Sequence, residues 1–210
     1  EQDSAGACLT HLVDNLLYPD DGLGPAAPPD VYDQLNQVAA TVPAGANGVI
    51  YTPWLNGERT PVDDHYVRAG FHNLGLGTNR ADLVRAVFEG VAYNTRWMHT
   101  YVERFAGTTF APLRFVGGGA QSELWAQILA DVLDRPVERV AQPRLANVRG
   151  AAFCGFAALG LLAWSEVPDL VEVAGRHHPD PTNRAVYDRG YAAFVSLYKR
   201  TKRTYAKLNR

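Results

Sequence analysis

Apolar residues recur along this chain with helical spacing in long stretches and as short runs between them. The helical spacing predicts helices at residues 4–17, 31–40, 79–106, 122–134 and 147–160, and from residue 180 to near the C-terminus. Short apolar or alternating runs predict strands at residues 48–53, 69–74, 113–116 and 137–141. Because helices and strands alternate, we expect an α/β protein with the sheet near its middle and several packed helices.

Four strands are few for such a sheet. Further strands are therefore expected either before residue 1 or in segments that look like loops. Residues 161–174 show neither pattern and are predicted to be a loop with a short turn, and His177 and His178 are placed in a Pro/Asp-rich loop. The chain has no initiator Met, and its first helical pattern starts almost at once, so we expect a fragment of a longer protein.

The longest predicted helix, residues 79–106, carries its own start and stop signals. Asn79 can cap the first turn, Asp82 lies where the helix dipole favours negative charge, and Gly107 ends the helix. Apolar residues cover more than one side of this helix. We therefore expect it to pack centrally, with its aromatic residues in the core.

Composition and charge narrow the classes of function. The 210 residues are 47% hydrophobic and 20% charged, as in an ordinary globular protein, and the formal net charge is −2. This charge gives no support for binding nucleic acid or a membrane, and the sequence has neither a run of 18 apolar residues nor a signal-peptide pattern. Cys8 and Cys154 lie among small apolar residues, which favours buried free thiols and a reducing cytoplasm.

A run of three glycines, Gly117, Gly118 and Gly119, joins the third predicted strand to the helix after it. Glycines at such a junction let the backbone approach a ligand closely, and the first turn of the following helix favours phosphate. The spacing matches none of the named phosphate-binding loops. From these residues alone, a nucleotide site and a tight structural turn remain about equally good interpretations.

Two further segments invite a functional interpretation. The loop at residues 54–68 contains Glu58, Arg59, Asp63 and Asp64, which could bind a ligand but are better explained as a surface loop whose charges pair with one another. The predicted helix at residues 147–160 is rich in Gly and Ala. We expect another helix or a nucleotide to pack very close to it.

Several motifs in order resemble those of the C-terminal domain of the FGGY carbohydrate kinases, and within that family most closely the xylulokinases. Residues 69–74, seven further residues and the helix at residues 82–89 are similar to the second signature of the family, with Asn73 where the signature has glycine. The Gly-Glu-Arg-Thr-Pro sequence at residues 57–61 is similar to a loop of these sugar kinases.

The resemblance continues through the chain to about residue 165. The glycine run and its helix resemble the adenosine-binding turn of the family, and residues 147–152 resemble the small-residue helix that follows, with Arg149 in place of an apolar residue. Residues 4–8 are similar to a helix start that contacts nucleotide phosphate. The whole chain, residues 1–210, is thus identified as one FGGY-type nucleotide-binding domain.

The resemblance implies an actin-like, ribonuclease-H-like ATPase fold and a set of nucleotide-binding residues. These are Gly6, Thr10, Gly117, Gly118, Gly119, Ala120 and Glu123, with Gly6 and Thr10 near phosphate and Glu123 near adenine. A Cβ at Gly118 or Gly119 is expected to enter the space of the adenosine.

The implied activity is transfer of the γ-phosphate of Mg²⁺-bound ATP to a sugar hydroxyl, with xylulose the preferred sugar. The catalytic Asp and most of the sugar site are implied to lie in an N-terminal domain that this chain lacks, so none of its carboxylates is assigned as catalytic and the chain alone is expected to be inactive. Ribulose, gluconate or glycerol remain alternative substrates. A non-catalytic module that dimerises through its long aromatic helix and Tyr-rich last helix remains the alternative of another class.

Overall fold

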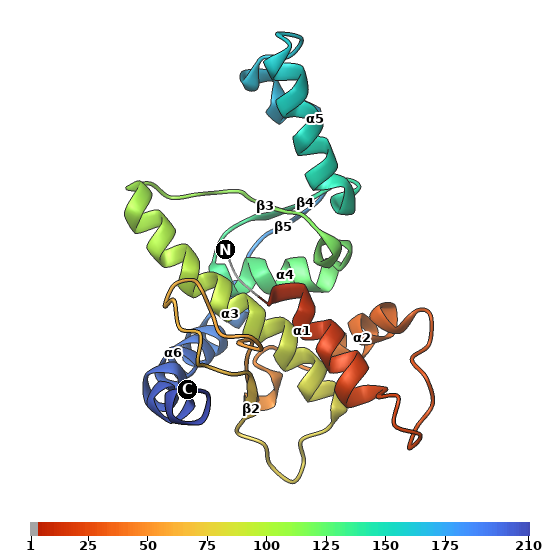
Figure 1. Cartoon of the computed structure of the whole chain (residues 1–210), viewed down its shortest axis with the longest axis vertical. Coiled ribbons are helices and arrows are strands. Elements are labelled where there is room, and N and C mark those ends of the chain that lie inside the picture. The colour runs from red at the N-terminus through yellow and green to blue at the C-terminus, as the bar shows by residue number, and fades with distance from the viewer. Residues whose placement is uncertain (1–3) are drawn as a thin grey trace.

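Helix α3 (Arg80–Ala106) runs through the middle of the fold, and the computed structural model, which describes residues 4–210, arranges the other elements around it (Figure 1). The Asn79 side chain accepts hydrogen bonds from the backbone N–H groups of Ala81 and Asp82, and the Asp82 carboxylate accepts one from the N–H of Asn79 at 2.9 Å. Gly107 ends the helix in the left-handed conformation. These predicted start and stop signals are confirmed.

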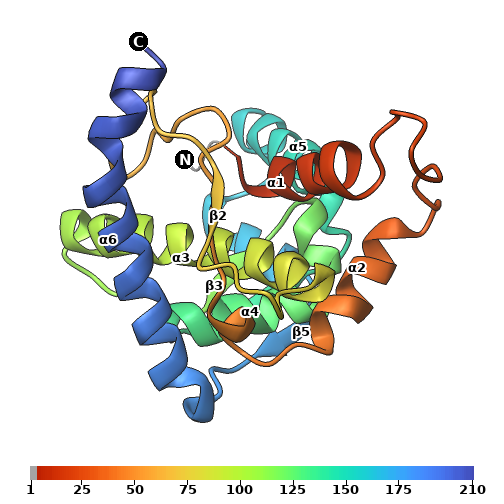
Figure 2. The same cartoon turned by 90° about the horizontal axis from the view of Figure 1, so that it is seen from below.

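Four other helices pack around α3 and one projects away. The packed helices are α1 (Ala5–Leu12), continued by a π-helical turn (Val13–Leu17), α2 (Val31–Ala40), α4 (Glu123–Leu133) and α6 (Arg184–Leu208). Seen from below, α6 runs along one side of the molecule and α2 lies on the opposite side (Figure 2). Five short 3-10 turns, Ala46–Gly48, Gly118–Gln121, Pro143–Leu145, Trp164–Leu170 and Pro181–Asn183, connect these elements in the described part of the chain.

The strands form two small sheets. Strands β1 (Ile50–Thr52) and β2 (Gly70–His72) pair antiparallel. In the second sheet, β4 (Val137–Val140) pairs parallel with β3 (Leu113–Phe115) and antiparallel with β5 (Val173–His177). All four predicted strands are present.

Strand β5 was not predicted from the sequence. Residues 161–174 were predicted to be a loop, but they contain the 3-10 turn Trp164–Leu170 and the start of this strand. His177, placed in a loop from the sequence, is the last strand residue and lies opposite Val137. The strand contains Ala174 and Gly175, which have little β propensity, so its pairing with β4 rather than its own residues decides its conformation.

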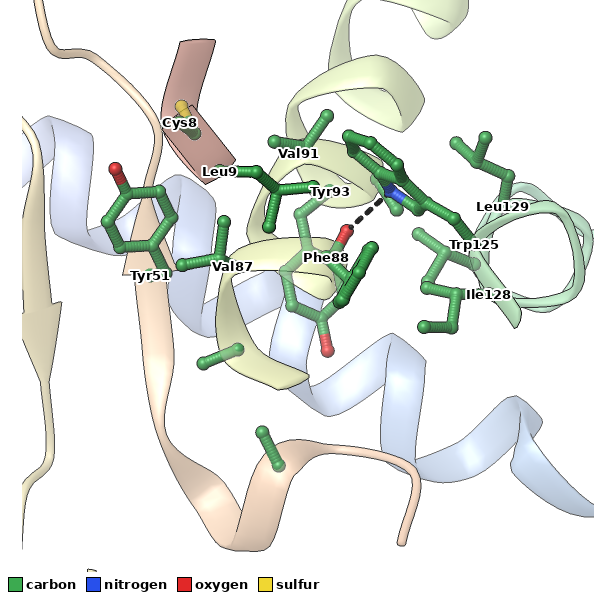
Figure 3. Packing of buried hydrophobic residues seen from close by; sticks show 14 of the residues in the cluster. Cys8, Leu9, Tyr51, Val87, Phe88, Val91, Tyr93, Trp125, Ile128 and Leu129 are labelled. Carbon is green, nitrogen blue, oxygen red and sulfur yellow. Dashed lines mark hydrogen bonds between the residues drawn. The ribbon is translucent and has the colours of Figure 1, made fainter. Parts of the chain in front are cut away.

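The core joins the first half of α3 to α1, α4, β1 and α6 (Figure 3). Phe88 of α3 meets Trp125 of α4 edge to face, and the indole N–H of Trp125 donates to the Phe88 carbonyl at 3.2 Å. On the other side of α3, Phe194 and Tyr198 of α6 pack against Trp97. The aromatic face of α6, which the sequence offered as a dimer interface, is thus used inside the chain.

A buried charged pair holds α3 to α6. Arg85 Nε lies 2.7 Å from Glu89 Oε1, which also accepts from the Tyr187 hydroxyl at 3.1 Å and from the Gly45 N–H at 3.0 Å. Burial raises the pKa of Glu89, and Arg85 acts in the opposite direction. Three donors on one carboxylate oxygen fix the separation of α3, α6 and the turn at Gly45.

The loop at residues 54–68 is more deeply held than expected. Glu58 is fully buried, and its carboxylate accepts from the side-chain amide of Asn94 at 2.8 Å. The Asn94 oxygen in turn accepts from the Trp54 indole at 3.2 Å. Glu58 therefore anchors the loop to α3, and the prediction of a surface position for this residue was wrong.

Helix α5 (Ala146–Ala158) projects from the rest of the molecule (Figure 1). None of its residues is buried, and a Cβ added at Gly150 or Gly155 meets no atom within 4 Å. Among residues 4–210, therefore, nothing packs closely against the glycines of this helix, contrary to the sequence prediction. Cys154 is exposed here, whereas Cys8 is buried as predicted and burial raises its pKa to about 12.

The second half of α3 also departs from the prediction. In the helix, Asp82, all residues from Val84 to Asn94, and Trp97 are buried, but Tyr101 is half exposed and Phe105 almost fully exposed. The helix therefore packs centrally only along its first half.

Within the described residues, no helix combines the length and the apolar character needed to cross a membrane.

Candidate nucleotide site

A cavity of about 360 Å³ opens between α1, α2, α4 and the glycine turn. This volume is in the range of pockets that hold small ligands. Its lining brings together residues far apart in sequence: Gly6, Leu9, Thr10, Tyr32, Asp33, Asn36, Phe88, Gly118, Gly119, Gln121, Ser122, Trp125 and Arg144. Four of the seven predicted nucleotide-binding residues are in this set, namely Gly6, Thr10, Gly118 and Gly119.

The three glycines of the turn differ in backbone conformation and in what a side chain would meet. Gly117 has φ +87°, a conformation that residues with a side chain rarely adopt. A Cβ at Gly119 would lie 2.8 Å from the Trp125 ring and 3.1 Å from Phe115, so this glycine permits packing inside the protein. A Cβ at Gly118 meets no atom within 4 Å, although Gly118 lines the cavity.

This distinction corrects the expectation for Gly119, whose added Cβ meets Trp125 rather than the cavity. A Cβ at Gly117 or at Gly118 meets no described atom within 4 Å, and of these two glycines Gly118 lines the cavity. Ala120 is buried under the turn, outside the lining of the cavity. The turn therefore presents its backbone to the cavity chiefly at Gly118.

Helix α4 begins at the cavity with a side-chain cap. The Ser122 hydroxyl oxygen accepts from the backbone N–H of Trp125 at 2.9 Å. The N-terminus of a helix carries the positive end of its dipole and N–H groups without partners inside the helix, and both favour an anion or a polar ligand. This arrangement matches the expected chemistry of a glycine turn followed by a helix.

Glu123, predicted to lie near adenine, is not among the residues that line the cavity. Its carboxylate pairs with Arg139 at 2.6 Å, and its side chain is largely exposed. Arg139 also donates to His177 Nε2 at 3.3 Å, and burial followed by the Arg139 charge lowers the pKa of His177. In this arrangement Glu123 links α4 to β4 and β5.

Residues of α1 and α2 form another part of the lining. A Cβ at Gly6 meets nothing within 4 Å, and the Thr10 hydroxyl lies 3.2 Å from the Tyr32 hydroxyl. The α2 residues of the lining, Tyr32, Asp33 and Asn36, were not identified from the sequence. No local motif marks them, because the fold places α2 beside α4 only through tertiary packing.

The cavity is suited to binding rather than to acid–base chemistry. Asp33 and Arg144 are the charged residues in its lining, and Leu9, Phe88 and Trp125 supply apolar surface. Within residues 4–210, no group of three or more His, Cys, Asp or Glu residues could hold a metal ion. An apolar floor, a glycine edge and a helix N-terminus together fit a nucleoside with an anionic end.

Comparison with known proteins assigns this chain to a family. A family model described as the C-terminal domain of the FGGY family of carbohydrate kinases matches residues 1–159. The chain belongs to this FGGY family. It is 31% identical over 179 residues to a xylulose kinase of Staphylococcus epidermidis, a match that covers 84% of this chain and 36% of that protein. A gluconokinase of Bacillus licheniformis is 28% identical over 180 residues, covering 85% of this chain and 35% of that protein.

The FGGY fold is confirmed by solved structures. The crystal structure of a xylulose kinase from Rhodospirillum rubrum matches with a TM-score of 0.79 at 32% identity, and covers 98% of this chain and 40% of that one. The chain thus has the actin-like ATPase fold of the FGGY kinases, in which ATP is the phosphate donor. It spans 35–40% of the length of these three relatives.

The residues of the FGGY signature have clear structural roles in this chain. Asp82 closes the capping box of α3, and Glu89 is the carboxylate of the buried pair with Arg85. Asn73, which replaces the signature glycine, has φ +64° and donates from its side chain to the Gly48 carbonyl at 3.0 Å. Asn is the residue after glycine that best tolerates this conformation, which explains the substitution.

Proposed function

We propose that residues 1–210 form the ATP-binding half of a sugar kinase and that the cavity beside Gly118 holds the nucleotide. The observation that carries this proposal is the cavity beside the glycine turn, which Gly118 lines with no described atom within 4 Å of its Cβ position, just before the capped helix α4. The other residues proposed to bind the nucleotide are Gly6, Thr10, Gly117, Gly119, Ala120 and Glu123, of which Gly6, Thr10 and Gly119 line the cavity. Gly6 and Thr10 line the same cavity from α1, and we propose that they lie near the phosphate groups.

The reaction of the complete kinase would be phosphoryl transfer from ATP to a sugar hydroxyl. Such transfer depends mainly on positioning and on neutralising phosphate charge, and the residues of this chain would supply the positioning of the nucleoside. We assign no catalytic base to this chain, because the resemblance to the FGGY kinases places the catalytic Asp in an N-terminal domain. Mg²⁺ would accompany the ATP phosphates, and no site for it is proposed among the described residues.

Xylulose is the substrate that we propose for the complete enzyme, because xylulose kinases match this chain in both sequence and structure. The gluconokinase match keeps gluconate as an alternative, and glycerol and ribulose remain further ones. Substrate choice would be made by residues outside this chain. Turnover of ATP with xylulose by this chain alone would contradict the division of the kinase into two parts.

The surface around α5 has features that favour contact with further polypeptide. Apolar side chains that are half or more exposed gather on and after this helix: Val148, Phe156, Leu159, Leu161 and Trp164. One edge of β3 pairs with no strand in residues 4–210. The solved xylulose kinase aligns with nearly the whole of this chain and has further polypeptide besides. We propose that this further part of the kinase covers α5 and carries the sugar site.

Calorimetric titration with ATP tests the proposed site. We expect measurable binding to the wild-type chain, and a loss of at least about tenfold in affinity in Gly118→Val, because the new side chain would occupy the nucleotide space. Gly155→Val on α5 is the matched control, since its Cβ also meets no atom within 4 Å but lies outside the cavity. Both variants should unfold at the wild-type temperature within a few degrees.

Two results would contradict the proposal. Equal ATP affinity in wild type and Gly118→Val would remove the turn from the site. A defined dimer that light scattering detects and that is indifferent to ATP would favour the non-catalytic, dimerising module instead.

A further inference from the structure

Asn36 of α2 and Ser122, the cap of α4, meet at the cavity across 86 positions of sequence. The Ser122 oxygen already accepts from the Trp125 N–H at 2.9 Å. Its hydroxyl hydrogen is therefore available, and it donates to Oδ1 of Asn36. The cap of one helix thus orients a side chain on another.

The other end of the Asn36 amide is also fixed. Nδ2 donates to the backbone carbonyl of Tyr32 at 2.9 Å, one turn earlier on α2. A flipped amide would place its oxygen against the Tyr32 carbonyl and would leave the Ser122 hydroxyl hydrogen without an acceptor. The hydrogen-bond network therefore defines which end of the amide is nitrogen.

One N–H of the amide remains for a ligand. The Asn36 amide nitrogen has two hydrogens, and its hydrogen bonds within the described residues use one of them. Asn36 lines the cavity together with the apolar side chains of Phe88 and Trp125. A single oriented donor beside apolar surface suits a flat, aromatic ligand with an acceptor nitrogen in its ring.

We propose that Asn36 reads the base of the nucleotide by donating this N–H to a ring nitrogen of a purine, with Ser122 as its positioning residue. This inference rests on the proposed function of the cavity. A purine offers N1, N3 and N7 as possible acceptors, and the oriented amide can satisfy one of them at a time. Recognition by a fixed donor also disfavours a base that presents a hydrogen at the same place.

Titration with ATP and with its 1-deaza, 3-deaza and 7-deaza analogues tests this proposal. Each analogue replaces one ring nitrogen by C–H. In the wild-type chain we expect one of the three to bind roughly tenfold more weakly than ATP, because one hydrogen bond is lost. In Asn36→Ala the same analogue should bind as well as ATP does, since the donor is gone.

Two more variants separate recognition from structure. Ser122→Asp keeps an oxygen that can cap α4 but cannot donate to Asn36, so the amide should turn and the discrimination among analogues should disappear, whatever happens to overall affinity. Gln37→Ala, on the exposed side of α2 outside the lining, should keep the wild-type discrimination.

The outcomes distinguish the two proposals. If the wild type binds ATP and all three analogues equally, or if Asn36→Ala keeps the wild-type discrimination, Asn36 does not read the base and the nucleotide site itself still stands. If the wild type binds no nucleotide, both proposals fail.

Discussion

Helices α3 and α5 both contain glycine and alanine at interior positions, yet their surroundings are opposite. A Cβ at Gly90 of α3 would lie 2.3 Å from the carbonyl oxygen of Tyr51, so the backbone of β1 lies too close to this helix for any side chain at position 90. A Cβ at Gly155 of α5 meets nothing within 4 Å. Small residues in a helix allow a close neighbour but do not say which polypeptide provides it. In α3 the neighbour lies in this chain, and for α5 we propose that it lies in the rest of the kinase.

The largest expected difference between the two regions concerns buried charge. Replacing Glu89 with Gln leaves the Arg85 guanidinium buried without its counter-ion, and we expect a loss of about 3–5 kcal/mol in the free energy of unfolding. Glu166→Gln, in the exposed 3-10 turn that follows α5, is the matched control and should change this free energy by less than about 0.5 kcal/mol. Urea unfolding followed by circular dichroism measures both variants. Similar losses of unfolding free energy in the two variants would show that the buried pair in α3 contributes no more to stability than an exposed residue near α5.

A smaller and more direct comparison makes the same substitution in both helices. Gly90→Ala forces a methyl group against the Tyr51 carbonyl and should destabilise the protein by about 1–3 kcal/mol, or more if β1 cannot move. Gly155→Ala removes an unfavourable helix residue in open space and should be neutral or stabilising by up to about 0.5–1 kcal/mol. Thermal unfolding of the two variants checks the opposite signs. A destabilising Gly155→Ala would mean that α5 already packs against something in solution.

The sequence predicted most of the fold because its helices carry strong local signals. The capping box at Asn79 and Asp82 and the stop at Gly107 mark α3 without any tertiary information. Strand β5 could not be found in this way, since Ala174 and Gly175 form a strand only through pairing with β4. The exposed end of α3 was also missed. Its aromatic residues follow the helical period as core residues do, and periodicity alone does not measure how far the partner extends.

The site was predicted in part. The glycine run pointed to Gly118. The contacts of the other two residues depend on other elements: a Cβ at Gly119 would meet Trp125 of α4, and Glu123 pairs with Arg139 of β4. No sequence motif marks Asn36, because its proposed role depends on a hydrogen bond to Ser122, which lies on another helix. Motifs thus pointed to the backbone of the proposed site, whereas the side chains that packing brings to the cavity could be found only in the structure.

Hydrogen exchange measured by mass spectrometry, with and without ATP, tests the central claim most directly. The account predicts slower amide exchange in three segments that line the cavity, residues 5–12, 31–36 and 117–125, and unchanged exchange throughout Ala146–Ala158 of α5. Slower exchange confined to α5, or no change in the cavity segments at an ATP concentration that saturates binding, would contradict it.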